Sequence, residues 1–156
     1  MANRVRLVPG KDPSLVYTVE DEKLPDGKYR TISIEGPIRF TPGRISHSRV
    51  QRTAFDDIGH LIADQFGGPG SKISGNLVSM HHLINKSSGP YAEMEREIRM
   101  FLGDRIGTMQ VRIEYEGSRY PWRPHAFQVT VTYSNGMRSK PWYIYNYNPV
   151  FERENR

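Results

Sequence analysis

Residues 57–63 read Asp-Ile-Gly-His-Leu-Ile-Ala and place His60 between a glycine and a short apolar run. Four further polar residues follow at wider spacing, namely Asn76, Asn85, Glu95 and Arg99. Histidine can accept a proton near neutral pH, and amide and carboxylate oxygens are ligands that Mg²⁺ prefers. An arginine can bind a phosphate group through charge-assisted hydrogen bonds. The set therefore suits the cleavage of a phosphodiester with the help of one hard metal ion.

The size and composition of the chain limit what surrounds this set. With 156 residues the chain is predicted to form one domain with one active site. A mean hydropathy of −0.65 indicates a globular protein with many polar loops. No apolar run is long enough to span a bilayer, and Met1–Arg4 lacks the apolar core of a signal peptide. Because there is no cysteine, a metal must be held by oxygen or imidazole ligands.

The charge of the chain favours a polyanionic partner. The formal net charge is +5, and the sequence pI is about 9.6. One acid-free stretch, residues 36–55, ends just before the histidine motif and contains Arg39, Arg44, Arg49 and Arg52. A second, residues 117–151, alternates basic with aromatic residues. Both stretches suit phosphate contact and base stacking, although solvated strand faces over an aromatic core would explain them equally well.

Antiparallel strands are predicted on both sides of the motif. Alternation bounded by Pro, Gly and Asp favours strands at residues 5–8, 15–19 and 29–34, and later at 77–80, 109–115 and 127–133. Residues 37–54 have no clear period and are predicted to be irregular, with one short strand near 44–46. The Asn135-Gly136 pair predicts a hairpin with a type I′ turn.

One main helix is predicted from Pro90 to Leu102. Proline suits the first helical position, Ser88 or Gly89 can cap the helix, and Gly103 follows its end. The apolar residues recur at helical spacing and predict one buried stripe made of Tyr91, Met94, Ile98, Phe101 and Leu102. Because Glu95 and Arg99 are four residues apart, they share a face beside that stripe.

The motif residues, with Phe66-Gly67-Gly68 and Tyr91-x-x-Met94-Glu95, resemble the DNA/RNA non-specific endonucleases with a ββα-metal, or His-Me finger, core. The resemblance is greatest to the branch found as C-terminal toxin domains of secreted bacterial proteins. It implies an α+β fold in which the ββα-metal core spans about residues 55–103 and antiparallel strands flank it on both sides. It also implies that residues 1–156 form a single nuclease domain.

The resemblance assigns a role to each candidate residue. His60 would be the general base, and Asn85 would bind a single Mg²⁺ or Mn²⁺ through its amide oxygen. Glu95 would support the metal site by holding one of the ion's water ligands. Arg99 would bind the phosphate, and Asn76 would fix the geometry of the site. Each has a structural alternative, namely a satisfied histidine, a loop-capping or turn-forming asparagine, or a Glu95–Arg99 helical pair.

Two features depart from the family pattern. Many members place an arginine at the position of Ile58, so the missing cation would come from Arg99, Arg52 or Arg49. The segment at residues 86–90 is slightly long, which makes Glu93 a rival to Glu95. We prefer Glu95 because it follows Tyr91-x-x-Met94 and shares a helix face with Arg99.

The histidines at positions 81 and 82 lie between the two asparagines of the motif. Adjacent residues project in different directions on a strand or a helix. We therefore expect His81 and His82 to be structural or to contact the substrate, rather than to bind a metal.

The sequence therefore predicts a metal-dependent endonuclease that cleaves DNA, with RNA left open as a substrate, and with weak sequence preference. The resemblance further implies a toxin that is secreted or delivered into a target cell as part of a larger polypeptide. An acidic immunity protein would be its partner. The alternatives are a nucleic-acid-binding module whose active site has decayed, and a structural or adhesive domain.

Overall fold

The computed structural model describes residues 3–42, 50–116 and 119–147. These residues form an α+β fold with two antiparallel sheets. The larger sheet has the strand order β1-β2-β3-β6-β7-β8, and the smaller sheet pairs β4 with β5. The strands of the larger sheet are β1 (Asn3–Pro9), β2 (Val16–Lys23), β3 (Tyr29–Ile38), β6 (Gly107–Glu114), β7 (Ala126–Tyr133) and β8 (Trp142–Tyr145).

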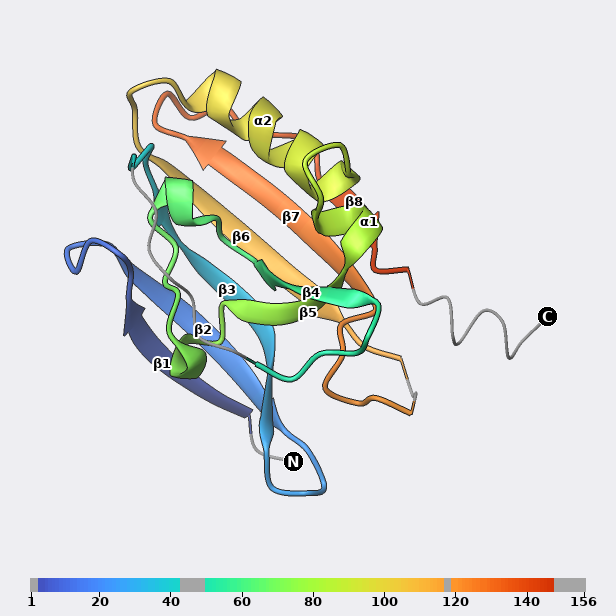
Figure 1. The fold of residues 1–156 in the computed structure, drawn as a ribbon. Coiled ribbons are helices and arrows are strands. Elements are labelled where there is room, and N and C mark those ends of the chain that lie inside the picture. Colours follow the sequence, from blue (N-terminus) through green and yellow to red (C-terminus); the bar gives the residue numbers. More distant parts are fainter. Residues whose placement is uncertain (1–2, 43–49, 117–118, 148–156) are drawn as a thin grey trace.

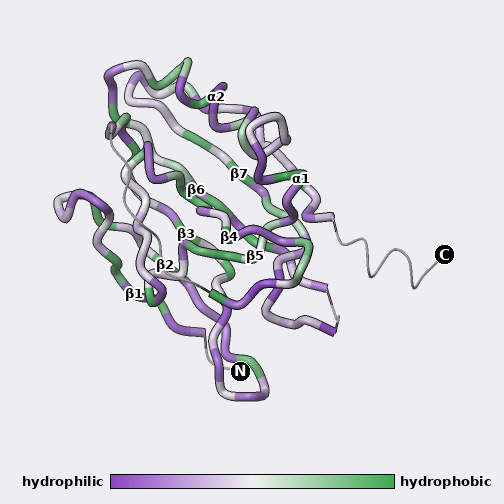
Figure 2. The backbone as a smooth tube through the Cα atoms, viewed as in Figure 1, coloured by the Kyte–Doolittle hydropathy of each residue, from purple (hydrophilic) through white to green (hydrophobic). Residues whose placement is uncertain are grey.

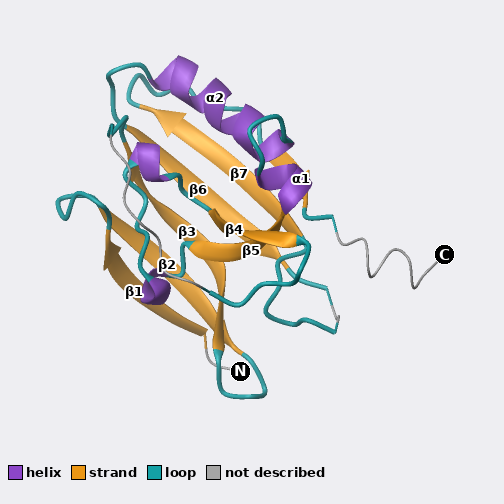
Figure 3. Ribbon diagram, in the orientation of Figure 1, coloured by secondary structure: helices purple, strands orange, loops and turns teal. Residues whose placement is uncertain are grey.

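The small sheet and the helices form a second layer over one face of the large sheet (Figures 1 and 3). They are inserted between β3 and β6, which are neighbours in the large sheet although far apart in sequence. In chain order the insertion contains β4 (Asp56–His60), the 3-10 helices η1 (Asp64–Phe66) and η2 (Lys72–Ser74), β5 (Leu77–His81), α1 (His82–Asn85) and α2 (Pro90–Leu102). The motif region is thus a hairpin followed by helices.

The core lies between these two layers. Alternate residues of β6, namely Met109, Val111 and Ile113, are buried, as the alternation of the sequence predicts. Hydrophobic residues gather along the central strands, as Figure 2 shows in green. They pack against Met80 of β5 and the buried face of α2 in one continuous cluster. Both layers of the fold therefore share a single core.

Helix α2 has the predicted bounds and most of the predicted stripe. Gly89 is its N-cap, Pro90 stands at its start, and Gly103 caps its end with a φ of 57°. The buried residues are Tyr91, Met94, Ile98 and Leu102. Phe101 was also expected in the stripe, but that prediction is wrong because its side chain is 59% exposed. Phe101 lies at the edge of the helix face and tilts over the ring of Tyr133 at 6.1 Å instead.

The hairpin after β7 differs from its prediction. A type I′ turn needs positive φ at both central residues, and Gly136 alone of the Asn-Gly pair has it, at 84°. The amide of Gly136 donates to the Tyr133 carbonyl, and the amide of Tyr133 donates to the Met137 carbonyl. These bonds enclose a three-residue loop with a left-handed glycine at its third position. The strand expected near residues 44–46 lies outside the described residues.

Candidate active site

A cleft of about 830 Å³ opens between β4, the two α-helices and residues 40–42. His60 from β4, Asn85 from α1 and Glu95 from α2 all line it. Three of the residues singled out in the sequence therefore meet at one place, although they come from three different elements. The cleft brings together an imidazole, an amide and a carboxylate.

His60 is the last residue of β4, and its side chain is half-buried. It pairs in register with Leu77 of β5, and the following amide, that of Leu61, donates to the Asn76 carbonyl at 2.9 Å. The preceding Gly59 packs against Met80, because a β-carbon at position 59 would lie 3.0 Å from that side chain. The glycine thus lets β4 approach the core closely, which fixes the strand that presents the histidine.

Asn85 is the last residue of the short helix α1. Its amide nitrogen donates to Asp57 Oδ2 at 3.4 Å, and the same carboxylate oxygen lies 3.1 Å from His82 Nδ1. Because the amide nitrogen faces Asp57, the amide oxygen is the atom left to meet a cation. Asp57 therefore helps to fix the direction of the Asn85 amide.

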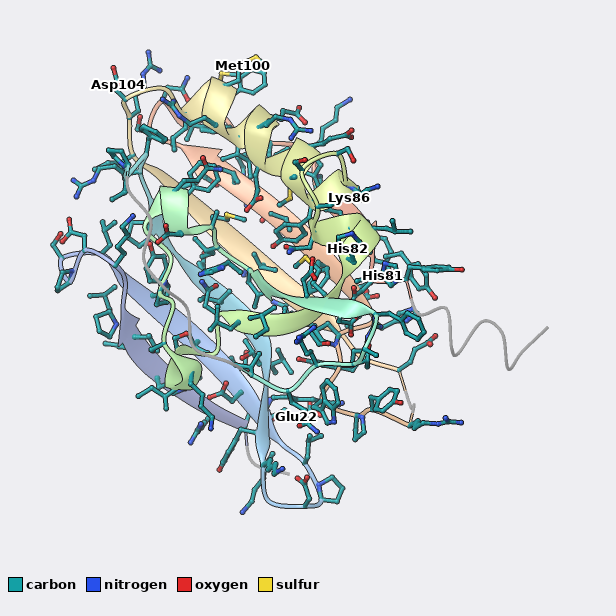
Figure 4. The ribbon with its side chains drawn as sticks, viewed as in Figure 1. Glu22, His81, His82, Lys86, Met100 and Asp104 are labelled. Atoms are coloured by element: carbon teal, nitrogen blue, oxygen red, sulfur yellow. The ribbon has the colours of Figure 1, made fainter. Side chains whose placement is uncertain are left out.

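The two histidines that start α1 have separate roles (Figure 4). His81 is 5% exposed, its Nδ1 accepts a hydrogen bond from the amide of Leu83, and its ring meets Tyr147 edge-on at 5.2 Å. His82 is exposed and contacts Asp57. Neither histidine lines the cleft. His81 is thus a structural residue that caps α1.

Glu95 occupies the cleft-facing side of α2. Burial raises the pKa of its carboxyl group from 4.5 to about 7, and the nearby Arg96 guanidinium opposes that rise. Its rival Glu93 is exposed and does not line the cleft. A carboxylate held in so poorly solvated a place gains most from a cation beside it.

The donor atoms in the cleft fit a hard, water-rich metal ion. The described residues contain no group of three or more His, Cys, Asp or Glu side chains that could hold a metal. Asn85 and Glu95 instead offer one amide oxygen and one carboxylate. Such oxygen donors suit Mg²⁺ or Mn²⁺, which keep several waters when few protein ligands are present.

The structure does not bring the other predicted residues into the cleft. Asn76 is fully buried, and its amide accepts from the Ile62 amide at 2.8 Å and donates to the carbonyls of Ile62 and Pro69 at 2.8 and 2.9 Å. With every polar atom of its side chain bonded to backbone, it cannot reach a substrate. Asn76 holds the loop after His60 in shape. Asn76 was expected among the catalytic residues for fixing the geometry of the site, and its contacts allow that indirect role but no contact with a substrate.

The arginines also depart from expectation. Arg52 donates to the Asp56 carbonyl at 2.7 Å and does not line the cleft, and Arg49 lies outside the described residues. Arg99 donates to the Gly103 carbonyl at 3.3 Å, and its guanidinium lies 3.9 Å from the centre of the Phe40 ring. Arg99 lies near the end of α2 and does not line the cleft, whereas Phe40, which it contacts, does.

Arg96 lines the cleft in place of these arginines. Its guanidinium donates to the Ser87 carbonyl at 2.6 Å, which holds it beside Glu95. No ion pair joins Glu95 to Arg99 within the part of the chain that the structure describes, so the expected helical pair does not form. The spacing of Ala92, Glu95 and Arg96, at i, i+3 and i+4, was the signal in the sequence that could have identified this arginine.

Ile58 lines the cleft two residues before His60. It thus shares the cleft with His60, where its apolar side chain supplies no charge. Arg123, from the basic and aromatic segment near the C-terminus, is buried and paired with Asp56 through contacts of 2.7 and 2.9 Å, and no described residue of that segment lines the cleft. Arg96 is therefore the cation that the described structure provides at this site.

Comparison with known proteins agrees with this arrangement. Residues 38–135 match the family described as DNA/RNA non-specific endonuclease. The chain is 38% identical over 79 residues to the type VII secretion system protein EssD of Staphylococcus aureus strain USA300. That match covers 47% of this chain and only 12% of EssD, so the chain corresponds to a small part of its relative.

Solved structures share the fold. NucA from Streptococcus agalactiae with magnesium ion bound superposes with a TM-score of 0.54 at 13% identity, over 93% of this chain and 85% of NucA. The same protein with no metal bound gives an equal TM-score over 92% and 84% of the two chains. This likeness confirms the predicted α+β fold with its ββα-metal core.

No helix among the described residues has the length and apolar character needed to cross a membrane. The family match covers more than half of the chain, from the end of β3 through β7, and it includes the whole cleft-forming insertion. The chain therefore belongs to the DNA/RNA non-specific endonuclease family.

Proposed function

We propose that this chain is a metal-dependent endonuclease that hydrolyses phosphodiester bonds of DNA with little sequence preference. RNA is also a substrate if the cleft accepts a 2′-hydroxyl. One observation carries the proposal: His60, Asn85 and Glu95 line a single cleft in a member of this family. The net charge of +5 supports a phosphate backbone as the substrate.

The roles follow from the chemistry of each group. The His60 imidazole takes a proton from the water that attacks phosphorus. The amide oxygen of Asn85 and the carboxylate of Glu95 would hold a single Mg²⁺ or Mn²⁺, Glu95 through the ion's water ligands. When bound, such an ion polarises the phosphoryl oxygen and supports the departing oxygen. Asp57 keeps the Asn85 amide turned toward the cleft.

Arg96 supplies the cation that Ile58 cannot. Its guanidinium lines the same cleft and is held by the Ser87 carbonyl. It is placed to bind the scissile phosphate and to offset the charge that develops there. In this proposal Arg96 takes the role that was first expected of Arg99 or Arg52, while Arg49 lies outside the described residues.

A plasmid assay tests the proposal. Supercoiled DNA is incubated with the native chain and Mg²⁺, with and without EDTA, beside His60→Ala and Asn85→Ala. We expect nicking and linearisation by the native chain only, and only without EDTA. Intact plasmid with Mg²⁺, Mn²⁺ and Zn²⁺ alike would refute the enzyme and favour the alternative, a decayed nucleic-acid-binding module whose loss is marked by Ile58.

We further propose that the chain acts as the toxic C-terminal part of a larger secreted effector, with an acidic immunity protein as its partner. Its likeness to part of a type VII secretion system protein supports delivery, and the basic surface supports an acidic partner. Expression of the native chain inside a bacterium should stop growth, whereas His60→Ala should not. Growth that stops equally with both would contradict a nuclease toxin.

A further inference from the structure

A second cavity, of about 610 Å³, lies beside β5 and is lined by no residue of α1 or α2. It is bounded by the N-terminal half of β1, the turn between β2 and β3, and η2. None of the proposed catalytic residues lines it. We call it the basic groove, because its wall contains Arg4, Arg6, Lys28, Arg30 and Lys72.

Acids pair with three of the five cations of the basic groove, because Arg4 and Arg6 share Asp21 and Arg30 pairs with Glu22 at 2.6 Å. The one carboxylate in its wall, Asp21, is 2% exposed and accepts from Nε of Arg4 at 2.9 Å and of Arg6 at 2.7 Å. Lys28 and Lys72 are exposed, and within the described parts of the chain neither forms an ion pair. Lys28 and Lys72 are thus the lining cations that no acid among the described residues pairs with, which favours an anionic ligand.

Aromatic rings lie among these cations. Tyr29 is 40% exposed, and the Arg4 guanidinium stacks 3.7 Å from the centre of its ring. Arg30 lies 4.1 Å from the centre of the Tyr115 ring in the same wall. Tyr29 is thus the exposed ring among these cations, and an exposed ring beside positive charge suits an unpaired base and its phosphate. An acidic protein surface would use the charge but not this ring.

The basic groove and the cleft border neighbouring strands of the small sheet. Ile58 and His60 of β4 line the cleft, and their register partners Ser79 and Leu77 of β5 line the groove. Side chains of directly paired residues lie on the same face of an antiparallel sheet, with Cα atoms about 4.5–5.5 Å apart. The two cavities are therefore lined by directly paired residues of adjacent strands.

We propose that the basic groove binds a single strand of nucleic acid that runs on from the scissile phosphate in the cleft. The groove holds the strand by its phosphates and stacks unpaired bases on Tyr29. The part of this inference that joins the bound strand to the scissile phosphate rests on the proposed nuclease function. The binding itself can be measured without cleavage.

The test compares two double variants of equal charge. Lys28→Gln with Lys72→Gln removes the free cations of the groove, and both side chains are exposed, so folding should be retained. The control, Arg112→Gln with Lys140→Gln, removes two exposed charges that line neither cavity. Fluorescence anisotropy with a labelled twelve-nucleotide oligothymidylate in EDTA gives Kd as a function of salt.

A single-strand phosphate contact contributes about 0.7 to the slope of log K against log salt. Loss of two contacts should lower the slope by about 1.4 and weaken binding about 25-fold at 0.1 M salt. Tyr29→Leu should weaken it about five-fold or more with an unchanged slope. The control variant should change both the salt slope and Kd by less than the groove variant does.

Equal affinities for the groove and control variants would overturn the inference, whatever the plasmid assay shows. Tight binding of polyglutamate that depends on Lys28 and Lys72, with none of the oligonucleotide, would also overturn it and assign the groove to an acidic protein. Oligonucleotide binding that needs these lysines in a chain that cleaves nothing would support the groove while refuting the proposed function.

Discussion

Glu95→Gln should make the metal-free protein more stable while it removes the metal-dependent activity. Burial raises the pKa of Glu95 to about 7, so the folded protein prefers the protonated carboxyl. Well below pH 4.5 this carboxyl is protonated in both the folded and the unfolded chain. The folded state then has the full stability that depends on a protonated Glu95. This stability is lost as the pH rises through 7, because folding must then desolvate a carboxylate.

The size of the effect follows from the two pKa values. Each pKa unit corresponds to about 1.4 kcal/mol, so the difference between 4.5 and about 7 amounts to about 3 kcal/mol. Glutamine is neutral at every pH and does not incur this cost. At pH 8 the free energy of unfolding of Glu95→Gln should therefore exceed that of the native chain by about 3 kcal/mol. At pH 4.5 the same pKa difference should contribute only about 0.4 kcal/mol to the gain.

Urea unfolding in EDTA at pH 4.5 and pH 8 measures this difference. The matched control is Glu93→Gln on the same helix, which should change stability by less than about 0.5 kcal/mol at both pH values because Glu93 is exposed. Adding Mg²⁺ at pH 8 should stabilise the native chain more than Glu95→Gln. A stability gain that is the same at both pH values would refute the reasoning, since it would show that the Glu95 carboxyl is not desolvated.

Three further outcomes are expected. Arg123→Met should cost about 3–5 kcal/mol in urea unfolding, because Asp56 is left buried and charged, and adding Asp56→Asn should restore part of the loss. Asn76→Ala should cost about 3 kcal/mol, because buried backbone groups lose three hydrogen bonds, and calorimetry should show a lower Tm. Arg96→Ala should slow plasmid cleavage by about 10–100-fold, whereas Arg99→Ala should leave kcat/KM nearly unchanged; the reverse order would restore Arg99 as the phosphate ligand.

Local sequence signals predicted the elements that depend on nearby residues. Helix α2 has the bounds set by Pro90 at its start, its apolar stripe, and the glycine after Leu102. The alternation along β6 and β7 likewise matches the strands observed there. The turn after β7 was predicted less well, because its type depends on the φ of Asn135, and the Asn-Gly pair fits more than one loop length.

The sequence by itself determined which chemical groups this protein has and that they belong to a ββα core. His60, Asn85 and Glu95 were identified from their types and order, and the cleft contains all three. Only the tertiary structure decided which neighbours join them. Arg96 and Arg99 are one turn apart on α2, and the choice between them depends on the Ser87 carbonyl and the Phe40 ring, which lie on other segments.

The two asparagines show the same division. Nothing local separates Asn76, which is buried and bonded to the loop after β4, from Asn85, which faces the cleft. The buried pair of Asp56 with Arg123 joins residues 67 positions apart, so no short-range pattern could reveal it. The direction and burial of a polar side chain are set by partners from distant parts of the chain, which is why the tertiary structure was needed to complete the site.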